Sequence, residues 1–388
     1  MSKAAALFET QVFRLAMDHP GDVTALAALF DAGTLHPAQV VAVIGKTEGN
    51  GGVNDFTRGY FTQSLMYLLA ERPGGSAKAL LREVPCVLSG GTEGVLSPHY
   101  LVFARVPAAA PADPRGGLAI GTGFGAALPP EAVGRMAQLR DVADTVAAAI
   151  AAAGMQPAEV RFVQVKTPCL TNARIAAARA RGAAPVSADL NRAMALARAA
   201  GALGVALALG EVAPERLSDA ALLDDLTLFS SCASVSSGIE IERCEVIVFG
   251  HAAGWGGRLQ LACRTMADVL DIGAVHAVLA DLGLAATPQV GGAQATRIRG
   301  VLVKGEPDRH GRVRGHRHTM LEDTDINAQR HLRGALGGMV AGVLGDGRLF
   351  VSGGAEHQGP DGGGLIAIIA ERAPDATPPA PPRRSVAP

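Results

Sequence analysis

The chain of 388 residues presents the same order of chemical groups three times. In each third, an apolar run ends in a lysine, a helical segment carries an arginine, and a second extended run ends in a serine. The three sets are Lys46, Arg58 and Ser89; Lys166, Arg198 and Ser236; and Lys304, Arg330 and Ser352. This recurrence predicts three equivalent structural units whose polar groups converge on one centre. It therefore constrains both the architecture and the position of a site.

Helical and extended patterns alternate within each third. Apolar residues spaced three and four positions apart predict helices over residues 23–33 and 57–71, and the second carries Arg58 near its start. Short apolar runs before Lys46 and Ser89 predict strands. The alternation predicts an α/β (α+β) fold of three structurally similar repeats, each a small sheet packed with helices.

Composition places the joins between the units. Residues 107–117 are rich in Pro and Ala, and a shorter join is expected at 251–257. Residues 371–388 are again rich in Pro and Ala, and we expect a disordered tail there. The predicted units A, B and C cover residues 1–105, 113–250 and 256–370.

Charge and cysteine content exclude several classes of protein. The formal net charge of −1 gives no basic face for nucleic acid. Five cysteines without a Cys-x-x-Cys pair are typical of reduced thiols in the cytoplasm. No signal peptide is visible, and the longest apolar run, residues 199–210, is too short to span a membrane. We expect a soluble, cytoplasmic protein with neither a nucleic-acid nor a membrane partner.

Each group also has an ordinary structural explanation. A lysine after a strand is usually solvated, an arginine on a helix usually lies at the surface, and Ser-Gly-Gly is usually a tight turn. Their threefold recurrence favours a site instead. Gly45-Lys46-Thr47 is not a P-loop, because Val40 stands where its first glycine is required. The glycines of the run 121–125 do not match the dinucleotide fingerprint, and we interpret them as a flexible connection.

Four longer blocks resemble the ring-opening amidohydrolases, the family of cyanuric acid hydrolase and barbiturase. The blocks are residues 46–55 (KTEGNGGVND), 89–99 (SGGTEGVLSPH), 317–321 (RHTML) and 352–360 (SGGAEHQGP). The resemblance covers residues from about 10 to 370 and is closer to cyanuric acid hydrolase. It implies repeats around a pseudo-threefold axis, a site on that axis and a homotetramer.

The resemblance also implies roles for individual residues. Lys166 and Ser236 match the catalytic pair of the family. The expected substrate-binding residues are Lys46, Arg58, Ser89, Gly90, Arg198, Ser236, Ser237, Lys304, Arg330, Ser352 and Gly353. A structural Mg²⁺ is expected at Glu306, Ala355, Gln358, Gly359, Pro360 and Gly363, largely through backbone oxygens, with no organic cofactor.

These residue types suit a threefold-symmetric acidic ring such as cyanuric acid. Arginine forks and serine turns match its carbonyls, and clustered cations favour a neutral lysine that can deprotonate serine. The implied reaction opens the ring to carboxybiuret, then biuret and CO2, in s-triazine degradation. Three alternatives stay open: a barbiturase that forms ureidomalonate, a non-catalytic binder of a small acidic ring, and a zinc-dependent cyclic amidase suggested by His316-Arg317-His318. For the zinc enzyme, further ligands at usable spacing are not evident.

Overall fold

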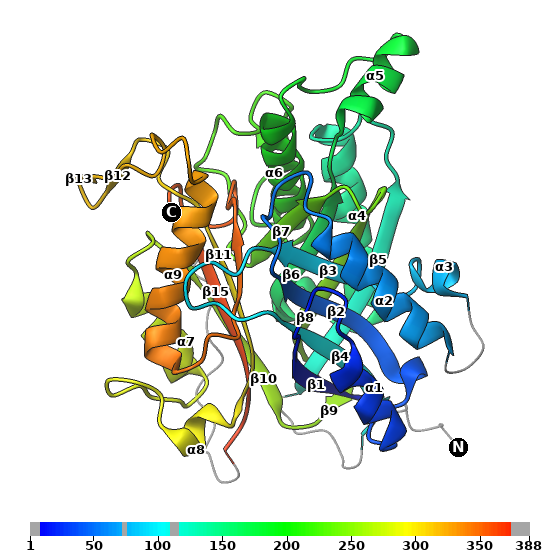
Figure 1. The fold of residues 1–388 in the computed structure, drawn as a ribbon, viewed down its shortest axis with the longest axis vertical. Helices are drawn as coiled ribbons and strands as arrows, with labels where there is room; N and C mark the ends of the chain where they lie inside the picture. Colours follow the sequence, from blue (N-terminus) through cyan, green and yellow to red (C-terminus); the bar gives the residue numbers. More distant parts are fainter. Residues whose placement is uncertain (1–7, 72–75, 109–115, 374–388) are drawn as a thin grey trace.

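Three sheets with one shared strand order form the body of the protein (Figure 1). The computed structural model describes residues 8–71, 76–108 and 116–373. In each sheet the first strand pairs antiparallel with the fourth, the fourth pairs antiparallel with the second, and the second pairs parallel with the third. This shared topology agrees with the predicted α/β fold of three similar units.

Each sheet takes these four strands from one third of the chain. The first sheet contains β1 (Phe8–Ala16), β2 (Val40–Thr47), β3 (Cys86–Gly90) and β4 (His99–Pro107), with β9 (Trp255–Gly256) added beside β1. The second contains β5 (Gly117–Ala127), β6 (Val160–Pro168), β7 (Ala233–Gly238) and β8 (Arg243–Ala252). The third contains β10 (Leu259–Met266), β11 (Ile298–Gly305), β14 (Phe350–Gly353) and β15 (Gly364–Glu371). We propose that the three units follow these sheets.

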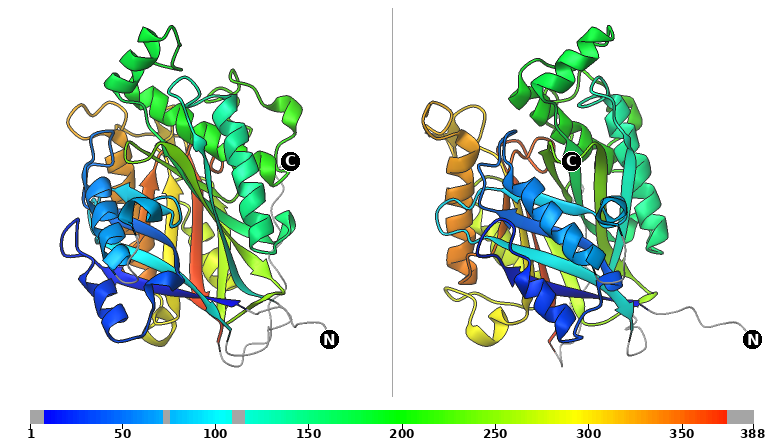
Figure 2. Two further views of the ribbon diagram at one scale, coloured as in Figure 1. Left: turned by 90° about the vertical axis from the view of Figure 1, so that its right-hand side faces the viewer. Right: turned by 45° about the vertical axis from the view of Figure 1, so that its right-hand side comes forward.

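Helices cover the outer faces of the sheets, while the strands gather at the centre (Figures 1 and 2). The first sheet carries α1 (Thr24–Asp31), α2 (Thr57–Glu71) and the short α3 (Ala77–Leu80). The second carries α4 (Met136–Ala152) and α6 (Leu190–Ala208), with α5 (Asn172–Ala180) projecting beyond them. The third carries α7 (Ile272–Asp281) and α9 (Ala328–Leu344), with α8 (Gly292–Ala295) and the hairpin of β12 (Arg312–Val313) and β13 (His316–Arg317) at its periphery.

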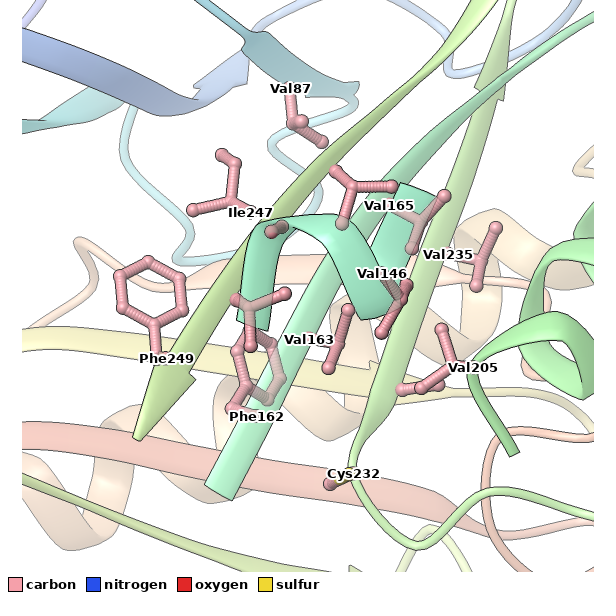
Figure 3. Close-up of a cluster of buried hydrophobic side chains, with 14 of the residues drawn as sticks. Val87, Val146, Phe162, Val163, Val165, Val205, Cys232, Val235, Ile247 and Phe249 are labelled. Atoms are coloured by element: carbon pink, nitrogen blue, oxygen red, sulfur yellow. The ribbon is translucent and has the colours of Figure 1, made fainter. Parts of the chain in front are cut away.

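The largest hydrophobic cluster joins all three sheets. It includes Val87 of β3, Phe162 of β6, Phe249 of β8 and Phe350 of β14, all completely buried. Figure 3 shows the part of this cluster around β6 and β8. The rings of Phe103 and Phe249, from the first and second sheets, lie 4.9 Å apart between centroids. The ends of the strands are therefore fixed relative to one another by a continuous core.

The structure corrects one interpretation made from the sequence. The glycines at 121, 123 and 125 belong to strand β5, which pairs with β8, and do not form a flexible connection. Glycine is required there because α4 lies close to the strand: a Cβ on Gly121 would approach the Ala149 carbonyl oxygen to 2.1 Å. The predicted tail lies outside the described residues from position 374 onward. No helix in the described ranges is long and apolar enough to cross a bilayer.

Candidate active site

The parallel strand pairs place each lysine beside the serine of its own unit. Lys46 is the register partner of Ser89, Lys166 of Ser236, and Lys304 of Ser352. Each pair therefore sits at the same point of the same topology. The predicted sets of lysine and serine are brought together as three equivalent pairs.

The lysines link the units into a closed ring. Lys46 Nζ donates a hydrogen bond to the carbonyl oxygen of Val351, which precedes Ser352. In the same way, Lys304 Nζ donates to Val235 O and Lys166 Nζ donates to Leu88 O, each at 2.6 Å. Each acceptor is the residue before the serine of another unit, so the three pairs converge on one centre. Across this centre, Ser236 Oγ and Ser352 Oγ lie 3.2 Å apart.

The middle lysine has different neighbours from the other two. Lys46 and Lys304 donate to the serine hydroxyl oxygens of their own units, at 3.3 and 2.9 Å. Lys166 Nζ instead lies 2.7 Å from the carboxylate of Glu240. In the same unit the hydroxyl groups of Ser237 and Thr167 lie 2.5 Å apart. The ring is therefore threefold in its backbone and asymmetric in its side chains.

Burial favours the neutral form of these lysines. All three side chains are completely buried. Loss of hydration, followed by the charge of Arg333, holds the pKa of Lys46 well below its ordinary value, and burial with Arg198 does the same for Lys304. Burial also lowers the pKa of Lys166, although the carboxylate of Glu240 opposes this shift. A buried amine with a lowered pKa can act as a general base.

An outer ring of arginine–glutamate pairs surrounds the lysines, again between units. Arg58 Nε lies 3.1 Å from Glu240. Arg198 binds Glu356 through two hydrogen bonds of 2.7 and 2.6 Å, and Arg333 binds Glu93 through two of 2.8 and 2.5 Å. Each of the three arginines is held by the neighbouring unit, so the guanidinium groups are fixed before any ligand binds.

Arg333, and not Arg330, occupies the position equivalent to Arg58 and Arg198. Arg333 is 4% exposed and forms the paired hydrogen bonds to Glu93. The side chain of Arg330 is 47% exposed and reaches Glu93 through one contact of 3.2 Å. Both residues lie on α9, three positions apart, and the inward face of that helix carries Arg333. The geometry therefore favours Arg333 as the third member of the set, where Arg330 was expected from the sequence.

Glycines allow the arginines to approach the serine turns. Gly91 and Gly354 have φ angles of +99° and +75°, in the left-handed region. A Cβ on Gly91 would lie 2.6 Å from Arg333 Nη2, and one on Gly354 would lie 2.5 Å from Arg198 Nε. Glycine is thus required at these two positions by both the backbone conformation and the space.

A cavity of about 540 Å³ opens over two of the arginines. It is lined by Arg198, Arg333 and Gly353, together with residues of the loop after β2 and the start of α9. Arg330 lies in the same wall. The cavity is large enough for a small planar ring and presents guanidinium groups from two units.

The predicted cation ligands lie on two neighbouring segments. Glu306 directly follows β11, and residues 355–363 form the loop between β14 and β15, where Gly363 O accepts a hydrogen bond from Glu306 N. Burial, together with the nearby carboxylates of Glu356 and Asp361, raises the pKa of Glu306 to about 8. No three His, Cys, Asp or Glu side chains in the described ranges gather into a metal site. A buried carboxyl beside backbone carbonyls nonetheless fits a hard cation.

Comparison with known proteins defines the family. A model of the amidohydrolase ring-opening protein family matches residues 11–371. The chain belongs to this family. It is 50% identical over 367 residues to the cyanuric acid amidohydrolase of Azorhizobium caulinodans, covering 93% of this chain and 98% of that protein. A cyclic amide hydrolase of the same organism is 46% identical, covering 92% of this chain and 98% of that protein.

A solved structure also matches this fold. It is described as "Cyanuric acid hydrolase: evolutionary innovation by structural concatenation" and superposes with a TM-score of 0.90 at 44% sequence identity. The match covers 94% of this chain and 100% of the other. The shared strand order of the three sheets described above agrees with a concatenated architecture.

Sequence reasoning missed Arg333 and gave no role to the three glutamates of the outer ring. Glu93, Glu240 and Glu356 each stand four residues after the serine of their unit, Ser89, Ser236 or Ser352. That constant spacing was a usable signal, because a carboxylate repeated with the arginines predicts ion pairs. Arg333 lies three and four positions before the buried Leu336 and Gly337 on α9, and this spacing places it on the inward face.

Proposed function

We propose that this protein opens the ring of cyanuric acid by hydrolysis. One observation carries the proposal: three lysine–serine pairs, joined in a closed ring by lysine–carbonyl hydrogen bonds from each unit to the next, surround a common centre. Cyanuric acid has three carbonyls that alternate with three N–H groups, so its symmetry matches that of the centre. The names of the similar proteins support the same substrate.

Arg58, Arg198 and Arg333 are proposed to bind the ring, with Arg330 at the rim of the cavity. Guanidinium groups suit an acidic imide whose charge is delocalised over its oxygens. The lysines Lys46 and Lys304 are proposed to orient the ring together with the serine turns. Those turns are Ser89-Gly90, Ser236-Ser237 and Ser352-Gly353.

Lys166 and Ser236 are proposed as the catalytic pair. Neutral Lys166 takes the proton of Ser236, and the serine oxygen forms a bond to a ring carbonyl carbon. The resulting oxyanion is stabilised by nearby N–H donors. When the tetrahedral intermediate collapses, the ring C–N bond breaks and the leaving nitrogen takes the proton from Lys166. Water then hydrolyses the ester on Ser236 and releases the opened ring.

Trapping of the acyl-enzyme tests the assignment of the pair. Rapid acid quenching followed by peptide mass spectrometry should find the adduct on the peptide that contains Ser236. Ser89→Ala and Ser352→Ala, which retain Ser236, serve as matched controls and should still form the adduct. An adduct on Ser89 or Ser352 would show that another unit supplies the nucleophile.

Barbituric acid is the second candidate substrate. The observation in its favour is the 46% identity to a relative named only as a cyclic amide hydrolase. Ring opening of both acids should be followed side by side with the same enzyme preparation. A higher kcat/KM on barbituric acid would reverse the preference, and tight binding without turnover of either ring would indicate a binding protein.

A structural Mg²⁺ is proposed at Glu306 and the loop after β14. Within the described residues Glu306 forms no ion pair, although it is buried near Glu356 and Asp361. A cation there would be held by the carboxylate of Glu306 and by backbone oxygens, because Gln358 Oε1 already accepts a hydrogen bond from Val235 N. The backbone carbonyl oxygens expected to coordinate the cation are those of Ala355, Gln358, Gly359, Pro360 and Gly363. Its role would be to neutralise the buried carboxylates and fix the loop.

Assembly and location complete the proposal. The exposed aromatic side chains of Phe56, Tyr60 and Tyr67 lie on or beside α2, where they could pack against another copy, and this supports a homotetramer. All five cysteines are free thiols, which supports a reducing, cytoplasmic location. Light scattering coupled to size-exclusion chromatography would measure the mass of the assembly.

A further inference from the structure

One of the three arginine–glutamate pairs in the outer ring is built differently from the other two. The arginines of those two pairs each use Nε and Nη2 to bind both oxygens of a glutamate. Arg58 instead contacts one oxygen of Glu240, through Nε at 3.1 Å. The same oxygen, Oε1, lies 2.7 Å from Lys166 Nζ. The glutamate of the middle unit is therefore shared between an arginine and a lysine.

The loop after β2 binds the other two nitrogens of this arginine. Arg58 Nη2 donates a hydrogen bond to Gly52 O at 2.9 Å, and Nη1 lies 3.5 Å from Asp55 Oδ2. Nη2 is the atom with which the other two arginines complete their paired hydrogen bonds. Because the loop already occupies Nη2, Arg58 does not form the paired hydrogen bonds with Glu240. The carboxylate therefore remains in contact with Lys166.

Asp55 fixes the conformation of this loop. Its Oδ2 accepts a hydrogen bond from Gly51 N at 2.8 Å, and its Oδ1 accepts from Thr57 N at 3.0 Å and from the Thr57 hydroxyl at 2.5 Å. The buried side chain packs on the serine turn of its own unit, where a Cβ on Gly90 would lie 1.7 Å from Asp55 Oδ2. The carboxylate is thus held from several sides, and it in turn holds Gly52 O in place.

The sequence distinguishes the three units at this position. Three positions before the arginines of the outer ring stand Asp55, Ala195 and Arg330. Of these three side chains, that of Asp55 is the one that attracts a guanidinium group. Lys166 accordingly contacts a carboxylate, whereas the other two lysines donate to the serine hydroxyls of their own units.

We propose that Asp55 is a positioning residue: it draws Arg58 aside, so that Glu240 is left to hold the catalytic lysine. The inference rests on the proposed function, in which Lys166 takes the proton of Ser236. In that step the O–H bond of Ser236 breaks and an N–H bond forms on Lys166, while no bond to either carboxylate forms or breaks. The adjacent carboxylate stabilises the ammonium group that results. An acid of the first unit thus selects the lysine of the second unit as the base.

Other charged and titratable groups surround these contacts. Those that act with Lys166 besides Glu240 are Arg58, Cys86, Cys169, Glu245 and Lys304. Asp55 also acts directly on Lys46, more weakly than burial and the other charges there. A test of Asp55 must therefore separate its effect through Glu240 from a direct effect on another lysine.

Asp55→Asn removes the charge that attracts Arg58 and keeps the size of the side chain. Arg58 should then form the paired hydrogen bonds with Glu240, and the lysine should lose its carboxylate. Because Glu240 raises the pKa of Lys166, this loss lowers it. In pH profiles of initial rates with cyanuric acid, the acid limb of kcat/KM should move to lower pH by about one unit. The ammonium is less stabilised, so kcat on the plateau should fall up to about tenfold.

Asp22→Asn is the matched control, because Asp22 makes the same three hydrogen bonds before α1, outside both rings. Its Oδ2 accepts from Asp18 N at 2.9 Å, and its Oδ1 accepts from Thr24 N at 2.9 Å and from the Thr24 hydroxyl at 2.6 Å. The residue three positions later is Ala25, where the site has an arginine. Asp22→Asn should therefore leave the pH midpoint in place, because a purely structural role does not move it.

The Glu240→Gln background tests whether Asp55 acts through this glutamate. Glu240→Gln should by itself move the midpoint to lower pH. Adding Asp55→Asn should shift the midpoint no further, because the lysine has no carboxylate left to lose. Asp55→Ser, which keeps an acceptor at the start of α2, gives the same expectations if Asp55→Asn folds poorly.

Three results would each overturn the inference: an unchanged midpoint in folded Asp55→Asn, an equal shift in Asp22→Asn, or a further shift in the double variant. Trapping in the unmodified protein distinguishes failure of this inference from failure of the proposed function. An adduct on Ser89 or Ser352 refutes the catalytic pair. An adduct on Ser236 leaves the pH midpoint to decide on Asp55.

Discussion

Removal of Arg333 tests which arginine of α9 belongs to the site. Arg333→Ala deletes the paired hydrogen bonds to Glu93 and a longer one of 3.3 Å to Asn50 O. Breaking a buried ion pair typically costs about 3–5 kcal/mol, since the partner is left uncompensated. Arg330 remains 3.2 Å from Glu93 and offsets part of that cost. We therefore expect the lower end, about 3 kcal/mol of unfolding free energy.

The matched variant is Arg330→Ala, which removes an exposed contact to the same carboxylate. Exposed pairs contribute about 0–1 kcal/mol, so its unfolding midpoint should scarcely move. In steady-state kinetics with cyanuric acid, Arg333→Ala should lower kcat/KM at least about a hundredfold. The kcat/KM of Arg333→Lys should lie between those of Arg333→Ala and the unmodified protein, because lysine keeps the charge and loses the paired hydrogen bonds of the guanidinium group. Denaturant unfolding and initial rates would be measured on all three. A greater loss in Arg330→Ala than in Arg333→Ala would refute the reassignment.

Three further predictions concern the surroundings of the site. Gly354→Ala would place a Cβ 2.5 Å from Arg198 at a backbone position with a left-handed φ, so it should reduce both the melting temperature and kcat/KM. The control is Gly338→Ala in α9, where the new Cβ meets open space. That variant should have an unchanged unfolding free energy or one raised by up to about 1 kcal/mol. Mg²⁺ should raise the melting temperature of the unmodified protein and of Glu371→Gln, and raise that of Glu306→Gln less; an equal shift in all three would contradict the cation site. Burial lowers the pKa of His99 to about 4, so the unfolded chain takes up its proton first, and about 3 kcal/mol of stability should be lost as the pH falls from 6.5 towards 4. Unfolding titrations of His99→Gln should show a flatter dependence over that interval, and an identical curve would exclude His99 as the cause.

The sequence predicted the strands that carry the site lysines, β2, β6 and β11, better than the first strands of the first and second sheets, β1 and β5. β2, β6 and β11 are buried on both faces, so each appears as a mainly apolar run that leads to a lysine. β1, the first strand of its sheet, is only partly buried and has a mixed composition, while glycines disguise β5. The predicted helix over 57–71 coincides with α2.

The sequence predicted the lysines and serines of the inner ring, but it predicted only part of the outer ring of arginine–glutamate pairs. The lysines and serines were found because each lies one or two residues before the end of a strand, where an apolar run gives way to polar residues. The choice between Arg330 and Arg333 depends on the rotation of α9 against the third sheet, which the spacing of its residues from Ser352 does not define. The pairing of Arg333 with Glu93 joins segments 240 residues apart, which no local spacing in the sequence defines.

The ring of lysines also has a consequence for stability. β3, β7 and β14 each lie at the edge of a sheet, and all three are almost entirely buried. The amines of Lys166, Lys304 and Lys46 donate hydrogen bonds to carbonyl oxygens on these three edges. A lysine replaced by methionine to abolish catalysis would therefore also leave a buried carbonyl oxygen of the neighbouring unit without its donor, which typically costs about 1–3 kcal/mol. Loss of activity in such a variant has meaning only for the fraction that stays folded.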